Sequence, residues 1–442
     1  KKTINKLTGA FALCFLFEGH NDLMVIARKG SPLAIGIGKG EMFVGSDAIA
    51  LSPMTNKISY LEEGDFAVLT RANVQVWDHS GALVEREIKT INTQNTQVQK
   101  DGYQHFMEKE IHEQPRVISL ALEYYFDPNT GKITLPDGID INFNDFEQIY
   151  LVACGTAFYA CHVAKYWFED IARIPVEIDI ASEFRYREPP IKKNTLAIFV
   201  SQSGETADTL AALRYCTGKA KKIVSLTNVS ESSISRESDC SLPILAGIEI
   251  GVASTKAFTC QLSVLFALAI KASSDLKKLS TKEQMNIYSE AIKIPSLINQ
   301  ILDKKDSFSA LATKLSEARD VLFLGRGLLY PLALEGALKL KEISYIHAEA
   351  YASGELKHGP IALIDKSVPV IILTPKDKLF DKNISNIQEV AARGGKVVLI
   401  SDKLGIDTIG EKFWNIIELP KTIDTLNPLL YAIAAQLIAY YT

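Results

Sequence analysis

One pattern occurs twice in the chain: a buried strand, a glycine-containing turn and a helix, then further strands and a closing apolar helix. The first copy opens at 148–153 with a turn at Gly155, and the second opens at 320–324 with a turn at Gly325. The corresponding later segments are 196–200 and 368–373, 222–226 and 396–400, and 255–272 and 427–441. A duplication with a period of about 170 residues predicts two similar domains and excludes a short-period solenoid.

The strands of both copies are continuously apolar, without polar residues at alternate positions. Such strands, joined by helices, are typical of parallel sheets that helices cover on both faces. We therefore expect an α/β fold with a doubly wound, flavodoxin-like sheet in each copy. The segment 273–315 between them is charged and has a helical pattern, which predicts bridging helices.

Residues 1–93 have a different pattern, with short apolar or alternating runs separated by glycine-containing turns. These runs lie at 11–17, 23–27, 33–37 and 66–78. Their close spacing predicts antiparallel strands, with room for a short helix at 46–51. The polar stretch 89–101 is typical of a linker, and the helical spacing in 103–126 predicts a pair of helices.

The composition is that of an ordinary globular protein. The 442 residues are 47% hydrophobic and 23% charged, with a net charge of −4. This balance excludes a mainly disordered chain and offers no basic surface for nucleic acid or an anionic membrane. The apolar stretch 428–441 contains Gln436 and is too short to cross a bilayer.

The six cysteines form no CxxC motif. We therefore predict neither a structural zinc site nor a disulfide framework. Free cysteines in apolar runs are typical of the reducing cytoplasm, where we expect the protein to act. The short run 11–17 follows a polar stretch and is soon interrupted by Glu18, so we expect no signal peptide. Because the chain starts with Lys1, we expect it to be part of a longer polypeptide.

The turn 201–206, with sequence SQSGET, follows a strand of the first copy and precedes a helix. Ligands of open α/β sheets bind at the carboxyl ends of strands, and helix N-termini favour anions. Three hydroxyl groups and Gly204 at such a point indicate a phosphate site. An ordinary Ser/Thr helix cap is the alternative. Since the turn lacks the lysine of a P-loop, we do not expect a nucleoside triphosphate.

Two glycine turns carry a weaker signal. The turn 154–156 alone is most simply a tight strand-to-helix connection, but it is expected beside the turn 201–206. The turn 325–327 lacks the third glycine and the ribose-binding acid of a dinucleotide site. We therefore predict no nicotinamide cofactor, and no other cofactor is indicated.

Residues Glu335, Lys339 and Glu342 have spacings that put them on one helix face. Spacing alone favours a solvated face of ion pairs. However, the helix follows a strand end, and His358 lies further on in a constrained HGP loop. A carboxylate and a histidine near a phosphate site could transfer the protons of a sugar isomerisation. No spacing suggests metal ligands.

Three runs in this order closely resemble the glutamine–fructose-6-phosphate aminotransferase family. They are SQSGETADTL (201–210), EIGVASTKAF (249–258) and LEGALKLKEISYIHAEAYASGELKHGP (334–360). The resemblance extends through the N-terminal region and covers essentially the whole chain. It implies a partial glutaminase domain of the N-terminal-nucleophile type and two sugar isomerase (SIS) domains. The implied divisions are 1–93 for the glutaminase part, 94–139 for linker and helices, 140–280 for the first SIS domain, 281–311 for bridging helices and 312–442 for the second SIS domain.

The resemblance also implies an activity, the conversion of fructose 6-phosphate and glutamine to glucosamine 6-phosphate and glutamate in a homodimer. The implied phosphate-binding residues are Ser201, Gln202, Ser203 and Thr206, with Thr156 nearby, and Val252 and Ser254 would line the sugar site. Glu342 would move a proton between C1 and C2, assisted by Lys339. His358, from the neighbouring subunit, would open the sugar ring.

Some features of the family are not matched in this sequence. The family's glutaminase uses an N-terminal cysteine, a position that Cys14, in a strand run, does not fit. The family's Schiff-base lysine lies in a tail beyond Thr442. Ala157 stands where relatives often have a serine. The sequence is therefore expected to carry the isomerase half of the enzyme.

Two other functions remain as alternatives. A phosphosugar-binding regulator would bind the sugar without turnover, but no DNA-binding motif is evident. A ketose–aldose isomerase without amination would not need the partial glutaminase domain.

Overall fold

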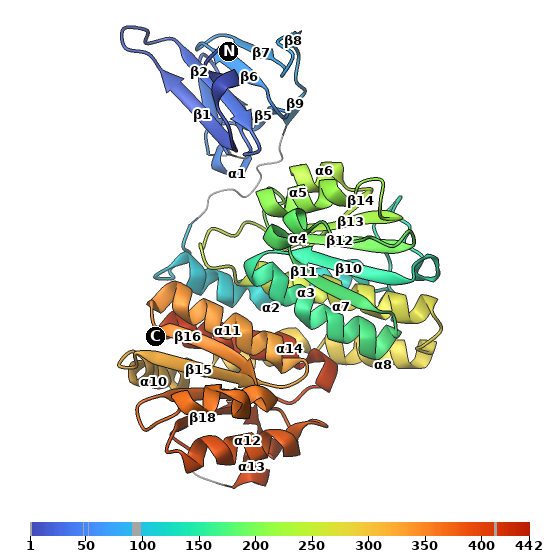
Figure 1. Cartoon of the computed structure of the whole chain (residues 1–442), viewed down its shortest axis with the longest axis vertical. Coiled ribbons are helices and arrows are strands. Elements are labelled where there is room, and N and C mark those ends of the chain that lie inside the picture. The colour runs from blue at the N-terminus through green and yellow to red at the C-terminus, as the bar shows by residue number, and fades with distance from the viewer. Residues whose placement is uncertain (1, 47, 52, 91–98, 411–412) are drawn as a thin grey trace. The chain divides into compact units, whose positions relative to one another are not determined.

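The computed structural model describes residues 2–46, 48–51, 53–90, 99–410 and 413–442. Two compact units divide the chain, residues 1–100 and residues 101–442 (Figure 1). Most of the predicted linker, residues 91–98, lies outside the described residues.

The first unit contains two antiparallel sheets, with strand orders β1-β2-β6-β7-β8 and β4-β3-β5-β9. Its elements are the 3₁₀ turn η1 (Ile4–Lys6), β1 (Phe11–Leu16), β2 (Met24–Lys29), β3 (Ala34–Ile37), β4 (Met42–Gly45), α1 (Ala48–Leu51), β5 (Lys57–Tyr60), β6 (Phe66–Leu69), β7 (Val74–Trp77), β8 (Leu83–Val84) and β9 (Ile88–Thr90). Side chains from both sheets, such as Ile26 and Ile35, share one buried cluster. The predicted antiparallel pairing is confirmed.

The second unit contains two parallel five-stranded sheets with matching strand orders, β11-β10-β12-β13-β14 and β16-β15-β17-β18-β19. The first domain contains β10 (Gln148–Ala153), α3 (Gly155–Trp167), β11 (Val176–Ile180), α4 (Ala181–Arg187), β12 (Thr195–Ser201), α5 (Ala207–Cys216), β13 (Lys222–Thr227), α6 (Ser233–Glu237), β14 (Cys240–Pro243) and α7 (Lys256–Asp275). In both sheets the domain's second strand, β11 or β16, is the edge strand next to the first strand, β10 or β15. This is the flavodoxin-like strand order. The predicted duplication and fold class are confirmed.

The second domain repeats this order of elements. It contains β15 (Asp320–Gly325), α11 (Leu329–Ser344), β16 (His347–Ala352), the 3₁₀ turns η4 (Ser353–His358) and η5 (Pro360–Leu363), β17 (Pro369–Leu373), α12 (Phe380–Ala392), β18 (Lys396–Asp402), α13 (Lys403–Ile409), β19 (Asn415–Leu419), η6 (Asp424–Leu426) and α14 (Asn427–Tyr441). The predicted bridging helices are α8 (Thr281–Ala291), α9 (Ile294–Leu302) and α10 (Lys305–Leu315).

Two short helical turns adjoin the regular elements of the first domain. The 3₁₀ turn η2 (Phe143–Asp145) precedes β10, and the π-helical turn η3 (Phe168–Ala172) extends α3. Arg173 ends this extension in a left-handed conformation, with φ of 59°. The side chains of η3 therefore lie at the carboxyl end of α3.

The segment 103–126 forms one helix, α2 (Phe106–Tyr125), so the prediction of a helix pair is wrong. Pro115 lies inside this helix and cannot donate to the carbonyl of Ile111, four residues earlier. The Gln114 side chain donates to that carbonyl instead, at 3.1 Å from Nε2. This substitute bond, together with packing of α2 against α7 and α9, keeps the helix continuous.

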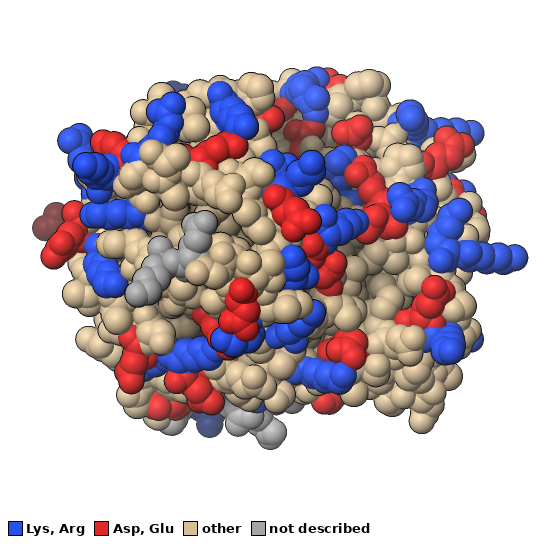
Figure 2. All heavy atoms as spheres, turned by 90° about the horizontal axis from the view of Figure 1, so that it is seen from below, with Lys and Arg blue, Asp and Glu red and all other residues tan. Residues whose placement is uncertain are grey.

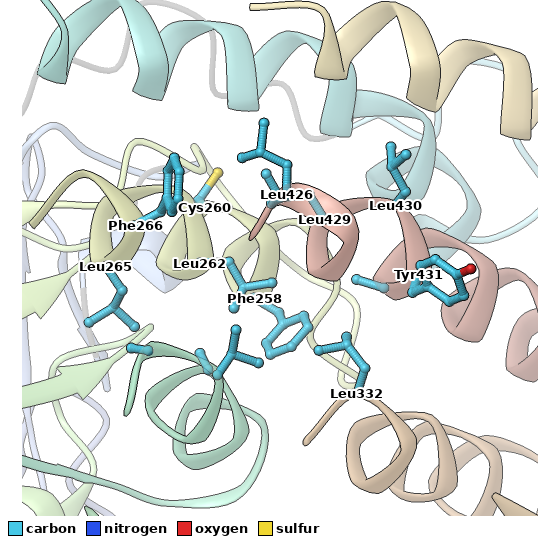
Figure 3. Close-up of a cluster of buried hydrophobic side chains, with 14 of the residues drawn as sticks. Phe258, Cys260, Leu262, Leu265, Phe266, Leu332, Leu426, Leu429, Leu430 and Tyr431 are labelled. Carbon is cyan, nitrogen blue, oxygen red and sulfur yellow. The ribbon is translucent and has the colours of Figure 1, made fainter. Parts of the chain in front are cut away.

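The main core of the second unit lies where α7 and α14 meet between the two domains (Figure 3). Phe258 and Phe266 of α7 and Leu430 of α14 are almost fully buried there. Helix α7 is long and apolar enough to cross a membrane, but 89% of its apolar window is buried inside the structure. Burial in a core accounts for that composition.

A few polar side chains tie these core helices together. Gln114 of α2 donates to Gln436 of α14 at 2.7 Å, and Gln436 donates to the backbone carbonyl of Thr255 at 3.1 Å. Thr259 of α7 donates to Gln114 at 2.9 Å. All three side chains are almost fully buried, so these bonds fix the register between helices.

All six cysteines are free, and Cys161, Cys216 and Cys260 are buried. Burial raises the pKa of each of these three thiols, which keeps them protonated as packing groups. On the surface shown in Figure 2, Lys and Arg side chains alternate with Asp and Glu side chains.

Candidate functional site

A cavity of about 350 Å³ lies at the carboxyl ends of β10 and β12, closed on one side by α11 of the second domain. Its lining comprises Cys154, Gly155, Thr156, Ala157, Val200, Ser201, Gln202, Ser203, Thr206, Val252, Ser254, Gln261, Leu338, Lys339 and Glu342. Every residue expected to bind substrate is among them, together with Lys339 and Glu342. The structure therefore brings side chains from four separate segments to one site.

The turn 201–206 forms one wall of the cavity and is held by its own hydroxyl groups. Gly204 N donates to Ser201 Oγ at 3.0 Å, and this oxygen lies 3.0 Å from Thr206 Oγ1. Gly204 has φ of +66°, and a Cβ there would lie 1.9 Å from Ser232 Oγ, so a glycine is required. The sharp turn directs the start of α5 toward the cavity.

The helix-cap explanation of this turn is not supported by the geometry. Thr206 is the N-cap residue of α5, yet its side chain makes no capping hydrogen bond. The first backbone N–H groups of α5 are thus left for another acceptor. This is the arrangement that binds an anion at a helix N-terminus.

Thr156 connects the two domains at the cavity. It lies in the first turn of α3, and its Oγ1 donates to Oε1 of Glu335 in α11 at 3.2 Å. Ala157 follows it and lines the cavity without a polar group. The position of Thr156 is therefore fixed by a side chain of the second domain.

Glu335, Lys339 and Glu342 form a row of charges along α11. Lys339 Nζ lies 2.7 Å from Glu342 Oε2 and 3.8 Å from Glu335 Oε1. Glu335 and Lys339 are each only 1% exposed, whereas the Glu342 side chain is 33% exposed. The interpretation as a solvated face is wrong, because Glu335 and Lys339 of this face are buried.

Burial raises the pKa of Glu335 to about 8; the nearby Lys339 and the hydrogen bond from Thr156 oppose this shift, and Glu342 adds to it. At neutral pH Glu335 is therefore mostly protonated. The ammonium group of Lys339 is then paired with one carboxylate, that of Glu342, whose side chain reaches the cavity. This pair has the proton donor and acceptor groups of acid–base chemistry.

The loop that carries Val252 and Ser254 is held by two glutamates that sequence reasoning did not assign. Glu249 accepts hydrogen bonds from Ser254 Oγ at 3.0 Å and from Thr255 N at 2.9 Å. Glu110 of α2 accepts a bond from Ile250 N at 2.6 Å. Val252 is 96% exposed at the tip of the loop. A glutamate at the start of the loop that leads into α7 was the available signal for Glu249.

His358 does not join the cavity of its own chain. It ends the turn η4 with an exposed side chain, and the following Gly359 has φ of 137°. Gln261, by contrast, lines the cavity and was not predicted; its buried Oε1 has no hydrogen-bond partner among the described residues. A lone amide in the apolar run of α7 was the signal that could have identified it.

Within the described part of the chain, no group of three or more His, Cys, Asp or Glu side chains is arranged to hold a metal ion. The polar groups of the cavity are mainly hydroxyls, amides and one ammonium–carboxylate pair. Such groups suit a phosphorylated, hydroxyl-rich ligand.

Comparison with known proteins identifies the family. The model of the SIS domain matches residues 143–271 and 314–442. Glutamine–fructose-6-phosphate aminotransferase (isomerizing) of Brucella abortus is 54% identical over 436 residues, which are 99% of this chain and 72% of that protein. The enzyme of the same name from Zymomonas mobilis is 52% identical over 440 residues, all of this chain and 72% of that protein.

Solved structures agree with this assignment. The C-terminal domain of glucosamine-fructose-6-phosphate aminotransferase from Francisella tularensis has 43% identity and a TM-score of 0.75, covering 78% of this chain and 97% of that one. Tagatose-6-phosphate ketose/aldose isomerase from Escherichia coli shares the fold, with 17% identity, a TM-score of 0.59 and coverage of 76% and 92%. From the sequence matches and the duplicated SIS fold, the chain belongs to the glutamine–fructose-6-phosphate aminotransferase family.

Proposed function

We propose that this chain binds fructose 6-phosphate in the 350 Å³ cavity and converts it to glucosamine 6-phosphate, with nitrogen that comes from glutamine. The observation that carries the proposal is the meeting of two features in one cavity. A hydroxyl-rich turn with free helix N–H groups faces a Lys339–Glu342 pair from the other domain. The first feature suits a phosphate and the second suits proton transfer on the sugar carbons.

In this proposal the phosphate accepts hydrogen bonds from Ser201, Ser203 and Thr206 and from backbone N–H groups at the start of α5. Gln202 and Thr156 complete this side of the cavity. Val252 and Ser254 contact the sugar from the loop that Glu249 holds. Ala157 adds no hydrogen bond.

Glu342 acts as the base that moves a proton between C1 and C2. Its carboxylate is part-exposed to the cavity, while Lys339 behind it is buried. The ammonium of Lys339 pairs with the Glu342 carboxylate and assists proton movement at the sugar oxygens. Because Glu335 is mostly neutral at pH 7, it does not compete strongly for Lys339.

His358 opens the sugar ring from the neighbouring subunit of a homodimer. His358 is exposed and lies outside the cavity of its own chain, which is consistent with a role in the cavity of the neighbouring subunit. We further propose that the enzyme acts in the cytoplasm, where its six free cysteines would stay reduced.

A phosphosugar-binding regulator would use the same hydroxyl-rich turn. The Lys339–Glu342 pair argues against it, because the buried charge of Lys339 is costly where only binding is needed.

Binding and turnover can be tested separately in the complete polypeptide. Calorimetry should show that Ser203→Ala weakens fructose 6-phosphate binding by about 1.5–3 kcal/mol, since a hydrogen bond to a charged group is lost. Unphosphorylated fructose serves as the control and should bind equally to both proteins. Equal weakening of both sugars would exclude this turn as the phosphate site.

Turnover should depend on Glu342. Glu342→Gln keeps the shape of the side chain but cannot accept a proton, so product formation should fall by about 10²–10⁴-fold with substrate affinity retained. A loss below tenfold would rule out Glu342 as the base. Retained sugar binding with no turnover in the wild-type protein would favour the regulator.

A further inference from the structure

The second domain has a cavity of about 540 Å³ at the position that corresponds to the candidate site. The turn after β15 (327–329) corresponds to the turn 154–157, and the turn after β17 (377–379) corresponds to 201–206. Residues 424–425, before α14, correspond to 252–254, before α7. The end of α3, with η3, takes the place that α11 has in the first cavity.

This location is where open α/β sheets bind ligands. In the order β16-β15-β17, the chain changes direction between β15 and β17, and the cavity lies at the carboxyl ends of these two strands. Crevices at such switch points are the usual ligand sites of this fold, and the volume is within the range for small molecules. The duplication therefore leaves a second cavity that the proposed reaction does not use.

The chemistry of the second cavity differs from that of the first. Where the first domain has hydroxyl groups, the second has Asp377, whose Oδ1 accepts a hydrogen bond from Leu379 N at 2.9 Å. The Asp377 carboxylate thus accepts the hydrogen bond of a backbone N–H that a ligand could otherwise use. Its negative charge would also repel a phosphate. The turn of the second cavity therefore lacks the hydroxyl groups that the first cavity offers to a phosphate, although Arg173 and Lys378 also line the second cavity.

Two carboxylates of this cavity make no ion pair among the described residues, although the more distant charge of Lys378 lowers the pKa of both. Among the described residues, neither Asp377 nor Asp424 has an ion-pair partner within 4 Å, whereas Asp170 lies within 4 Å of both Arg173 and Lys378. Partial burial raises the pKa of Asp377 and of Asp424, and the Asp424 charge adds to the shift of Asp377. A cationic group bound between them would relieve this cost.

Buried hydroxyl groups provide a separate indication. Thr425 lines the cavity, and its buried Oγ1 has no hydrogen-bond partner within the described part of the chain. Tyr431 is not part of the lining, but its side chain is only 1% exposed and its hydroxyl also has no partner among the described residues. Burial raises the pKa of this hydroxyl, and the charges of Asp402 and then Asp377 add to the shift. In Figure 3 this hydroxyl points away from the other labelled side chains. Buried polar atoms without partners are uncommon and indicate a missing polar contact.

The remaining walls exclude a bare metal ion and favour an organic molecule. Tyr166, Trp167 and Leu328 give the cavity an apolar side. Trp167 is fixed by its Nε1, which donates to the backbone carbonyl of Thr425 at 2.9 Å. No group of three acidic, histidine or cysteine side chains with metal-site geometry occurs in the described residues.

We propose that the second cavity binds a small organic amine as its cation, with the ammonium group on Asp377 and Asp424 and the carbon skeleton against Tyr166 and Leu328. This site is distinct from the sugar phosphate site, and its occupation does not require the proposed reaction.

Calorimetry of the whole chain with benzylamine tests the proposal, and benzyl alcohol is the matched neutral probe. Benzylamine should bind with one site per chain, and the alcohol should bind about tenfold more weakly or worse. The double substitution Asp377→Asn with Asp424→Asn should weaken benzylamine binding by about tenfold or more. Asp407→Asn, which removes a surface carboxylate of α13, is the control and should leave the affinity unchanged.

Ser203→Ala separates this proposal from the proposed function. It should weaken fructose 6-phosphate binding and leave benzylamine binding intact. Absence of benzylamine binding, equal binding of the alcohol, or displacement of the amine by fructose 6-phosphate would each overturn the amine site. If the double variant does not fold, Asp424→Asn alone gives the same test at an exposed position.

Discussion

The buried carboxyl group of Glu335 should make the second unit less stable as the pH rises. Its pKa is raised from 4.5 to about 8 in the folded protein, so the folded state holds this proton more tightly than the unfolded state does. Stability from this proton is complete below about pH 4.5, the unfolded value, and it is lost as pH rises through about 8. The whole pKa difference corresponds to about 5 kcal/mol.

Glu335→Gln removes this dependence because the amide is neutral at every pH and can still accept the hydrogen bond from Thr156. Between pH 6 and pH 9 the wild-type protein should lose about 3 kcal/mol of unfolding free energy that the variant keeps. With a urea m-value of about 3 kcal/mol/M, the wild-type midpoint should fall by about 1 M relative to the variant.

Urea titrations monitored by circular dichroism at the two pH values measure this difference. Glu317→Gln, at an exposed position, is the control for removal of a carboxyl group and should behave as the wild type does. If Glu335→Gln and the wild type lose equal stability between pH 6 and pH 9, Glu335 is ionised in the folded protein and Lys339 is shared between two carboxylates.

Three further outcomes are expected. Mixed dimers of Glu342→Gln and His358→Ala chains should recover about a quarter of wild-type activity, because half the dimers are mixed and each has one intact site; no recovery after confirmed subunit exchange would assign His358 to its own chain. Gly204→Ala should lose phosphate binding and about 1–3 kcal/mol of stability, since its Cβ would collide with Ser232; unchanged sugar affinity in calorimetry would contradict this. Phe266→Ala should cost about 3–5 kcal/mol in denaturant unfolding, as a fully buried ring is removed from the core; a smaller cost would mean that the core repacks.

The sheets could be predicted from the sequence because buried parallel strands leave a direct mark, a continuous apolar run after which the chain turns. The phosphate-binding turn could be located for the same reason, since it follows such a strand. Helix continuity at Pro115 could not be predicted, because it depends on a side-chain bond from Gln114 to a backbone carbonyl. Proline alone indicates a break.

The burial of Glu335 and Lys339 could not be predicted either. A spacing of three and four residues gives one face whether that face turns to solvent or inward, and only the packing of α11 against α3 and α14 decides between them. The bond between Thr156 and Glu335 joins residues 179 apart, so it depends on how two domains meet, which no local pattern records.

The bond between Gln114 and Gln436 has a consequence for synthesis of the protein. The two side chains are separated by 322 residues, and α14 fills the core between both domains. The ribosome must therefore synthesise α14 before this core can close. Until then the apolar faces of α2 and α7 remain uncovered. Folding of the second unit is completed after translation of α14, and until then the nascent chain is a natural substrate for chaperones.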